Sequence, residues 1–259
     1  MRISFVIVSK CLVEYQEKLK DIPLQFCYHQ EAGATQILLE GEKFRHIYKS
    51  RRSCAESKLW LRNLRDDFLY AYRCQECKRE QALLILESQH EFKNIPKYPL
   101  NIALAMIEPK NIEKILPFLN EMGCEKLILF WADLSQRHFR IDEKRLQRIL
   151  HSSSEQCGRS DCVQLEILPH LQAVFEADST LMLFDFEGKG LENIVVSKSP
   201  ATIAIGPEGG FSPKEKQFAK EAKIQLICGG NLILRSETAA TYIQANAHLF
   251  YDIIPHSES

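Results

Sequence analysis

The stretch Ile205-Gly206-Pro207-Glu208-Gly209-Gly210-Phe211-Ser212-Pro213 connects a strand to a helix. The preceding run, Ala201 to Ile205, is short and mostly apolar. Ser212 to Glu215 form a capping box with Pro213 at the first helical position, which predicts a helix start. Three glycines in five positions let a backbone approach a ligand closely, and a helix start supplies free N–H groups. Ligands bind at this edge of open α/β sheets, so we expect a ligand-binding loop with Gly209 at positive φ.

A second segment, Cys228-Gly229-Gly230-Asn231-Leu232-Ile233-Leu234-Arg235-Ser236-Glu237, follows the next apolar strand, Ile224 to Cys228. Two such loops would flank one crevice. Neither loop has the G-x-G-x-x-G spacing, and neither has the Gly-Lys-Ser/Thr of the P-loop. Dinucleotide and triphosphate binding therefore lose support. On spacing alone, an ordinary strand-to-helix turn is the simpler interpretation of each loop.

The region from residue 98 to 259 alternates between strand and helix patterns. Apolar runs predict strands over residues 101–107, 125–131, 181–186, 201–205 and 224–228. Capping and breaking residues predict helices from Pro109 to Gly123 (kinked at Pro117), from Asp142 to Gly158, from Ser212 onward and over residues 236–251. Strands that read as continuous apolar runs favour a parallel sheet covered by helices on both faces. We expect an α/β domain here.

The region from residue 1 to 97 has a different pattern. Short alternating runs at residues 35–39, 58–64 and 81–87 predict strands of a small, mostly β domain. The polar, proline-containing stretch from Lys93 to Pro99 is typical of a join between domains. A chain of 259 residues has room for two unequal domains.

Composition narrows the class of protein. At 45% hydrophobic and 26% charged residues, the chain is an ordinary globular protein rather than a disordered, collagen-like or coiled-coil one. Its nine scattered cysteines indicate reduced thiols. The apolar stretch from Ile3 to Val8 is too short for a signal peptide, and no run approaches the roughly 20 apolar residues of a membrane helix. We expect a soluble, cytoplasmic protein.

Charge is distributed unevenly along a chain whose net charge is −1. Residues 1–97 hold 17 Lys/Arg against 13 Asp/Glu, and residues 98–259 hold 16 against 21. Only Glu56 opposes the basic run formed by Lys43, Arg45, Lys49, Arg51, Arg52, Lys58, Arg62 and Arg65. Such a run favours a phosphate-binding surface, with a solvated face as the equally weighted alternative. Phe44 and Tyr48 within it could stack on bases, although core packing is favoured for Phe44.

Other candidate sites carry less weight. Cys74 and Cys77 have metal-ligand spacing, but no second C-x-x-C accompanies them, so two ordinary thiols are favoured over zinc. His46, His138 and His248 show no local pairing with a nucleophile. We expect no metal.

The two glycine loops together resemble a known family. Gly-Pro-Glu-Gly-Gly-Phe-Ser followed at this distance by Gly-Asn-x-Ile-Leu-Arg-x-Glu-Thr-Ala is similar to the SPOUT, or trefoil-knot, methyltransferases that methylate N3 of a uridine in 16S ribosomal RNA. Glu155-Gln156-Cys157-Gly158-Arg159 resembles the Glu-Gln-x-x-Arg segment of that family. The stretch from Arg45 to Arg52 resembles, more weakly, the His-x-x-x-Val-Leu-Arg element of a PUA-like RNA-binding domain.

This resemblance implies a knotted α/β SPOUT domain over residues 98–259 and a mostly β, PUA-like domain over residues 1–97. It implies S-adenosylmethionine as cofactor, a homodimer that completes the site across its interface, and the assembled small ribosomal subunit as substrate. The implied cofactor contacts are Leu183, Phe184, Asp185, Ile205, Gly206, Pro207, Glu208, Gly209, Gly210, Leu226, Gly229, Gly230, Asn231, Leu232 and Leu234. The expected RNA contacts are Lys43, Arg45, Lys49, Arg51, Arg52, Arg62, Arg137 and Arg159.

The chemistry that the resemblance implies needs no metal. Methyl transfer from a sulfonium is an in-line displacement, so the protein aligns the methyl donor with the uracil nitrogen. Uracil N3 must lose its proton, and a nearby cation stabilises the charge that spreads onto the flanking carbonyls. Arg235 is our candidate for that cation. Glu237 or Glu208 is a candidate proton acceptor, although a Glu beside a helix start more often stabilises the helix.

The chain departs from the family pattern at several positions. Leu232 stands where the family usually has Arg, Pro117-Phe118 where it has Gln-Lys, Gln136-Arg137 where it has Glu-Arg, and Ser50-Arg51 where it has Val-Leu. The cofactor loops are intact, so the reaction class is better supported than the target. The alternatives are a related knotted methyltransferase acting on another RNA, such as a ribose 2′-oxygen of tRNA or rRNA, and a non-catalytic ribosome-binding factor.

Overall fold

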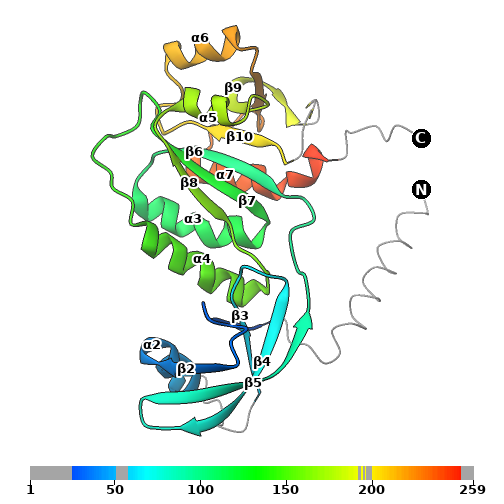
Figure 1. Ribbon diagram of the computed structural model, residues 1–259. Coiled ribbons are helices and arrows are strands. Elements are labelled where there is room, and N and C mark those ends of the chain that lie inside the picture. The colour runs from blue at the N-terminus through cyan, green and yellow to red at the C-terminus, as the bar shows by residue number, and fades with distance from the viewer. Residues whose placement is uncertain (1–24, 51–57, 192–193, 195, 197–199, 252–259) are drawn as a thin grey trace, which may run out of the picture. The chain divides into compact units, whose positions relative to one another are not determined.

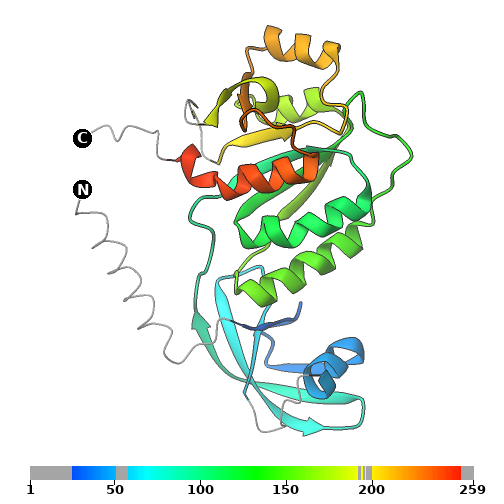
Figure 2. The ribbon, with the colours of Figure 1, turned by 180° about the vertical axis from the view of Figure 1, so that it is seen from behind.

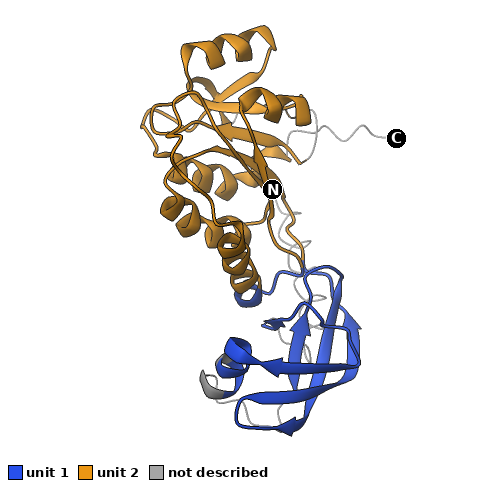
Figure 3. Ribbon diagram, turned by 60° about the vertical axis from the view of Figure 1, so that its left-hand side comes forward, with its two compact units in different colours: residues 1–94, 155–160 blue, residues 95–154, 161–259 orange. Residues whose placement is uncertain are grey.

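The computed structural model describes residues 25–50, 58–191, 194, 196 and 200–251. The chain divides into two compact units, coloured separately in Figure 3. Unit 1 holds residues 1–94 and Glu155–Ser160, and unit 2 holds residues 95–154 and 161–259. The boundary therefore lies three residues before the one expected at residue 97, and a short segment of the second region joins unit 1.

Within the described residues, unit 1 contains a five-stranded sheet in the order β1-β3-β4-β5-β2. Its strands are β1 (Cys27–Tyr28), β2 (Gln36–Glu40), β3 (Leu59–Arg62), β4 (Phe68–Cys77) and β5 (Gln81–Glu91), labelled in Figure 1 where there is room. β1 runs parallel to β3, and the other neighbours are antiparallel. The short helix α2 (Gly41–Phe44) continues into a π-helical turn over Arg45–Ser50.

The mostly β fold predicted for this region is confirmed. In β2, Ile37 and Leu39 are each 1% exposed while their neighbours face outward, so burial alternates along the strand although the outward-facing Leu38 is apolar. The structure adds β4, which the sequence analysis did not predict. Leu69, Tyr70, Ala71 and Tyr72 of β4 are all buried, so this strand lacks the period of two that signals a half-buried strand.

Unit 2 contains a parallel sheet, six-stranded among the described residues, in the order β11-β9-β10-β6-β7-β8. Its strands are β6 (Leu100–Ala105), β7 (Cys124–Phe130), β8 (Gln164–Leu168), β9 (Met182–Gly190), β10 (Thr202–Ile205) and β11 (Gln225–Cys228). Its helices are α3 (Pro109–Glu121), α4 (Glu143–Cys157), α5 (Leu171–Ala177), α6 (Pro213–Glu221) and α7 (Ser236–Ala245), followed by a 3₁₀ turn over Ala247–Phe250.

Helices cover both faces of this sheet. Ile102 and Leu104 of β6 belong to a cluster with apolar residues of α3, α4 and α7, the face that Figure 2 shows. Ala103 and Ala105 point the other way, into a cluster that includes residues of α5 and α6. Because both faces are buried, the strands are continuous apolar runs, and the predicted parallel sheet with two covered faces is confirmed.

Several local predictions are also confirmed. Asp142 caps α4, because the Arg145 backbone N–H donates to Asp142 Oδ1 at 3.0 Å. Gly123, just after α3, has φ +93°, as expected of a residue that ends a helix. The sequence analysis missed β8 and α5. The kink at Pro117 and the trefoil knot stay predictions. In the part of the chain that the structure describes, no helix has both the length and the apolar character to cross a membrane.

Candidate functional site

The candidate site lies where three neighbouring strands of unit 2 end. β9 lies between β10 and β11, and all three run parallel. Their carboxyl ends therefore meet at one edge of the sheet. The two glycine loops that follow β10 and β11 flank the end of β9, as the sequence pattern predicted.

These ends enclose a cavity of about 290 Å³, near the lower end of the roughly 300–1,000 Å³ typical of small-molecule sites. Twelve of the fifteen predicted cofactor contacts line it. They are Phe184, Asp185, Ile205, Gly206, Pro207, Glu208, Gly209, Gly210, Gly229, Gly230, Leu232 and Leu234.

The other three predicted contacts, Leu183, Leu226 and Asn231, do not line the cavity. Leu183 is 1% exposed, and both leucines pack into the apolar cluster on the α5 and α6 side of the sheet. Successive residues of a strand point to opposite faces, so Leu183 lies in the core while Phe184 reaches the site. Asn231 is exposed on the second loop.

The first loop, residues 205–212, is held by a dense set of hydrogen bonds. The Gly210 N–H donates to the Pro207 carbonyl at 2.8 Å. The predicted capping box is confirmed, because Ser212 Oγ accepts from the Glu215 N–H at 3.1 Å and Glu215 Oε2 accepts from the Ser212 N–H at 2.8 Å. Ser212 Oγ also donates to Asp133 Oδ2 at 2.6 Å. The start of α6 is thereby fixed to the segment after β7.

The glycine with positive φ in this loop is Gly210, at +70°. The expectation for Gly209 is wrong, because Gly209 is absent from the positive-φ region. A Cβ at Gly209 would instead lie 3.2 Å from Leu134 Cδ1, whereas a Cβ at Gly206 would lie 3.1 Å from the Gly210 carbonyl carbon. At Gly206, therefore, a side chain would require the backbone of Gly210 and Phe211 to shift by a few tenths of an ångström.

A glycine that the sequence analysis did not single out shapes the same edge. Leu226 of β11 pairs with Leu183 of β9, but the next residue, Ile227, pairs with Lys189. The residues of β9 between Leu183 and Lys189 therefore leave the ladder between β9 and β11, beside the cavity. A Cβ at Gly188 would lie 2.4 to 2.6 Å from the Ile227 backbone, so only glycine fits without a shift. A glycine inside a strand, here Gly188 with Gly190 two residues on, was the available signal.

Seven further residues line the cavity and were not predicted. They are Phe186, Phe211, Lys216, Cys228, Ile233, Ser236 and Ala239. Ser236 joins the two loops, since its Oγ donates to the Gly206 carbonyl at 2.7 Å. Lys216 of α6 donates to Asp185 Oδ1 at 3.0 Å and to Glu187 Oε1 at 2.9 Å. The bond to Glu187, followed by the bond to Asp185, raises the pKa of Lys216.

The second loop, residues 228–235, is held much less firmly. Leu232 and Ile233 are 75% and 86% exposed. Arg235 lies between the lining residues Leu234 and Ser236, and its exposed side chain contacts no other described residue through a hydrogen bond or ion pair. Glu237 lies in the first turn of α7 and does not line the cavity. The catalytic roles of Arg235 and Glu237 stay predictions.

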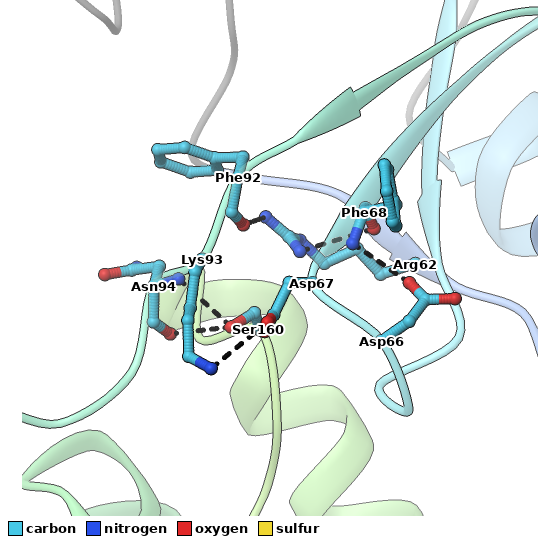
Figure 4. Close-up of polar contacts among 8 residues, drawn as sticks. All are labelled: Arg62, Asp66, Asp67, Phe68, Phe92, Lys93, Asn94 and Ser160. Carbon is cyan, nitrogen blue, oxygen red and sulfur yellow. Dashed lines mark hydrogen bonds and ion pairs between the residues drawn. The ribbon is translucent and has the colours of Figure 1, made fainter.

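Two predicted RNA contacts are wrong, and the first is Arg62. Arg62 is 1% exposed, so it is not available to a phosphate. Its Nη2 donates to the Phe92 carbonyl at 2.6 Å and its Nη1 to the Phe68 carbonyl at 3.3 Å (Figure 4). The guanidinium also lies 5.4 Å from the ring centres of Phe26 and Phe92. Arg62 is a structural residue of unit 1.

Arg159 is also buried, at 5% exposure, so its predicted contact with a phosphate is wrong in this conformation. Glu155, from the same motif, accepts a hydrogen bond from the Tyr28 N–H at 2.6 Å and so holds β1. The first part of this motif thus has a structural partner in unit 1.

The remaining predicted RNA contacts fall into three groups: exposed residues, one residue already bound within unit 1, and residues whose side chains the structure does not describe. Arg45 and Arg137 are exposed. Lys43 donates to the Tyr28 carbonyl at 2.6 Å, and its ammonium lies 4.3 Å from the centre of the Tyr28 ring. Partial burial lowers the pKa of Lys43, and the charge of Glu155 opposes that effect. Lys49 lies in the π-helical turn, and Arg51 and Arg52 lie outside the described residues.

Among the described residues, no three His, Cys, Asp or Glu side chains are grouped as metal ligands would be.

Comparison with known proteins adds independent information. A family profile for RNA methyltransferase domains matches residues 93–248. The ribosomal RNA small subunit methyltransferase E of Helicobacter pylori (strain ATCC 700392 / 26695) is 39% identical over 229 residues, which are 87% of this chain and all of the relative.

Solved structures show the same fold. A crystal structure of a probable rRNA-methyltransferase from Porphyromonas gingivalis has a TM-score of 0.77 at 21% identity, over 87% of this chain and 98% of the other. A crystal structure of a ribosomal RNA small subunit methyltransferase E from Neisseria gonorrhoeae, bound to S-adenosyl methionine, has a TM-score of 0.72 at 20% identity, over 86% and 95%. Both likenesses extend across the two units.

Proposed function

The chain belongs to the RNA methyltransferase family and within it to the ribosomal RNA small subunit methyltransferases E, and from this premise we propose that it transfers a methyl group from S-adenosylmethionine to N3 of a uridine in 16S ribosomal RNA. The observation that carries this proposal is the convergence of two glycine loops on one cavity at the end of β9. With the small subunit as its substrate, the protein is proposed to work in the cytoplasm.

The residues of the cavity fit such a cofactor. Phe184, Phe186 and the exposed Leu232 and Ile233 supply apolar surface for an adenine ring and a methionine side chain. Backbone groups of the two glycine loops that line the cavity supply hydrogen-bonding edges. A Cβ at Gly229 would lie 2.9 Å from Phe184 Cζ, so a side chain there would displace an aromatic wall of the cavity.

When bound, S-adenosylmethionine supplies an electrophilic methyl group. The chain holds the uracil nitrogen in line with that group and needs no metal for it. Arg235, exposed at the end of the second loop, stabilises the negative charge that develops on the uracil carbonyls as N3 loses its proton. Glu208, which is exposed and lines the cavity, and Glu237, one residue beyond Ser236, are the candidate proton acceptors.

Two further parts of the proposal concern partners. The chain acts as a homodimer, because the second loop leaves Leu232 and Ile233 exposed beside the cavity, where a second protein surface would cover them. It acts on the assembled small ribosomal subunit, with Lys43, Arg45 and Arg137 among its phosphate contacts. These phosphate contacts, and not the cofactor loops, determine which uridine is methylated.

The deciding experiment incubates the protein with radiolabelled S-adenosylmethionine and small subunits from cells that lack the modification. We expect one methyl group per subunit, at a uridine where reverse transcription stops, because N3 methylation blocks base pairing. Naked 16S RNA should accept far less label. Sedimentation of the free protein should give a dimer.

Three results would redirect the proposal. Label at a ribose 2′-oxygen would indicate a related methyltransferase. Such a label is recognised because the adjacent phosphodiester bond then resists alkaline hydrolysis. Label in tRNA would change the substrate. Tight subunit binding with no label would indicate a ribosome-binding factor. Gly229→Val serves as the matched control, because it should remove cofactor binding in calorimetry while leaving subunit binding intact.

A further inference from the structure

Two thiols of unit 1 share one face of β4 because of a β-bulge. Cys74 and Cys77 are three residues apart, and in a regular strand such residues point to opposite faces. Here Cys74 pairs with Leu84 of β5 and Cys77 with Ala82, with a register shift between Cys74 and Glu76. Leu84 and Ala82 are two residues apart and both belong to the unit 1 core. The bulge therefore brings both cysteines to the same face.

The spacing suits a covalent link. Two steps along a strand span roughly 6.6 Å, and a disulfide joins Cα atoms about 4.4–6.8 Å apart. Cys77 is exposed and Cys74 is half-buried, so a small reagent can reach the pair. Neither forms a disulfide in this structure.

Tyr48, in the π-helical turn over Arg45–Ser50, packs against the same unit 1 core as Cys74. Burial and then the neighbouring Cys74 raise the pKa of Tyr48. Desolvation and then Cys74 also raise the pKa of Cys77. Since the thiolate is the reacting form of a thiol, a raised pKa disfavours Cys77 as the sulfur that attacks first, and that role is assigned to Cys74.

We propose that Cys74 and Cys77 form a reversible dithiol–disulfide site that reacts with low-molecular-weight disulfides. The Cys74 thiolate attacks one sulfur of the reagent, and the other half leaves as a thiolate and takes up a proton. The Cys77 thiol then loses its proton, its sulfur attacks Cys74, and the second half of the reagent leaves as a thiol. Two cysteines are oxidised by two electrons, and one reagent disulfide is reduced to two thiols.

This site is independent of the proposed methyltransferase function, but it adjoins the predicted RNA surface. Tyr48 packs against the same core as Cys74 and lies in the same π-helical turn as Arg45. Zinc is the competing ligand for a C-x-x-C pair, and two thiols are too few for a closed zinc site. Among the described residues no third ligand stands beside them.

The test uses the full chain and oxidised glutathione. After reaction, alkylation of free thiols and digestion with trypsin, both cysteines lie in one peptide, Cys74–Lys78, because trypsin cleaves after Arg73 and Lys78. We expect this peptide to have lost two hydrogens and to carry no alkyl group, and dithiothreitol to restore both alkylation sites. Cys77→Ser should trap glutathione on Cys74.

A wild-type peptide that carries two alkyl groups, or two glutathiones, under conditions that modify Cys74 in Cys77→Ser would overturn the proposal. So would zinc that copurifies in a 1:1 ratio and is lost in both Cys74→Ser and Cys77→Ser.

Discussion

The two glycine loops beside the cavity have similar sequence patterns, yet they differ in how firmly the rest of the chain holds them. The first loop is closed by the turn at Pro207 and Gly210, and the buried Ser212 anchors it to α6 and Asp133. The second loop exposes Leu232 and Ile233 almost fully and is tied down at its end, where Ser236 binds the Gly206 carbonyl. The first loop is fully held by contacts within the chain. The second loop leaves apolar side chains exposed, where a cofactor, an RNA or a partner subunit could cover them.

This difference separates two kinds of contribution. Residues of the first loop stabilise the folded chain, because their hydrogen bonds are buried and already made. Residues of the second loop contribute when a cofactor, an RNA or a partner subunit covers them, so their substitution should change binding or turnover with little effect on folding. The following predictions test that separation.

The largest effect is expected at Arg235, in turnover alone. Arg235→Ala should lower the single-turnover methylation rate by roughly 10² to 10³, the scale for removing one preorganised donor. Cofactor affinity should stay within a few-fold, because Arg235 does not line the cavity. Arg235→Lys keeps the charge and should recover part of the rate.

Calorimetry and sedimentation on the same preparation complete this test. If cofactor affinity and dimer content fall together while the rate per remaining dimer is unchanged, Arg235 is structural and the second loop is not a catalytic element.

The next effect is expected in folding, from the first loop. Ser212→Ala removes the cap of α6 and the bond to Asp133, so the free energy of unfolding should fall by about 1–2 kcal/mol. Urea denaturation measures this change. Asn231→Ala, at an exposed position of the second loop, is the matched control and should stay within about 0.5 kcal/mol of wild type. Equal losses in the two variants would contradict the distinction between the loops.

The first loop was also the more predictable one. Ser212, Pro213 and Glu215 interact with near neighbours in the chain, and local interactions leave a local signature, so the helix start followed from the sequence. The bond from Ser212 to Asp133 joins residues 79 positions apart, and no local sequence pattern predicts such a bond. The same holds for Lys216, which reaches Asp185 from another element.

The errors have physical reasons of the same kind. Arg62 stands in a basic run that favours a solvent-exposed surface, but carbonyl oxygens and aromatic rings from other segments enclose its guanidinium. β4 was missed because burial on both faces removes the alternating pattern. The bulge that unites Cys74 and Cys77 depends on pairing with β5, so spacing alone left them as two ordinary thiols.

A smaller change in the free energy of unfolding is expected when one glycine of each loop is replaced by alanine. Gly210 has φ +70° and Gly230 has φ +116°, and a Cβ at either meets no atom within 4 Å. Alanine therefore introduces backbone strain alone. In the fixed first loop, Gly210→Ala should lower the free energy of unfolding by about 1 kcal/mol. In the exposed second loop, the backbone can relax, and Gly230→Ala should cost less. A Gly230→Ala loss that matches or exceeds the Gly210→Ala loss would show that the second loop is as rigid as the first.

The smallest effect on folding is expected at Leu232, where the family usually has Arg. Leu232 is 75% exposed, so Leu232→Arg should leave the free energy of unfolding within about 0.5 kcal/mol of wild type. Its added charge lies beside the cavity and should reach an RNA phosphate, which would make the slope of log affinity for small subunits against log salt steeper by about one. Leu232→Gln, polar but uncharged, is the control and should leave the slope unchanged. An identical slope in the wild type and Leu232→Arg would mean that RNA does not approach this side of the second loop, and it would favour the partner subunit as the surface that covers Leu232.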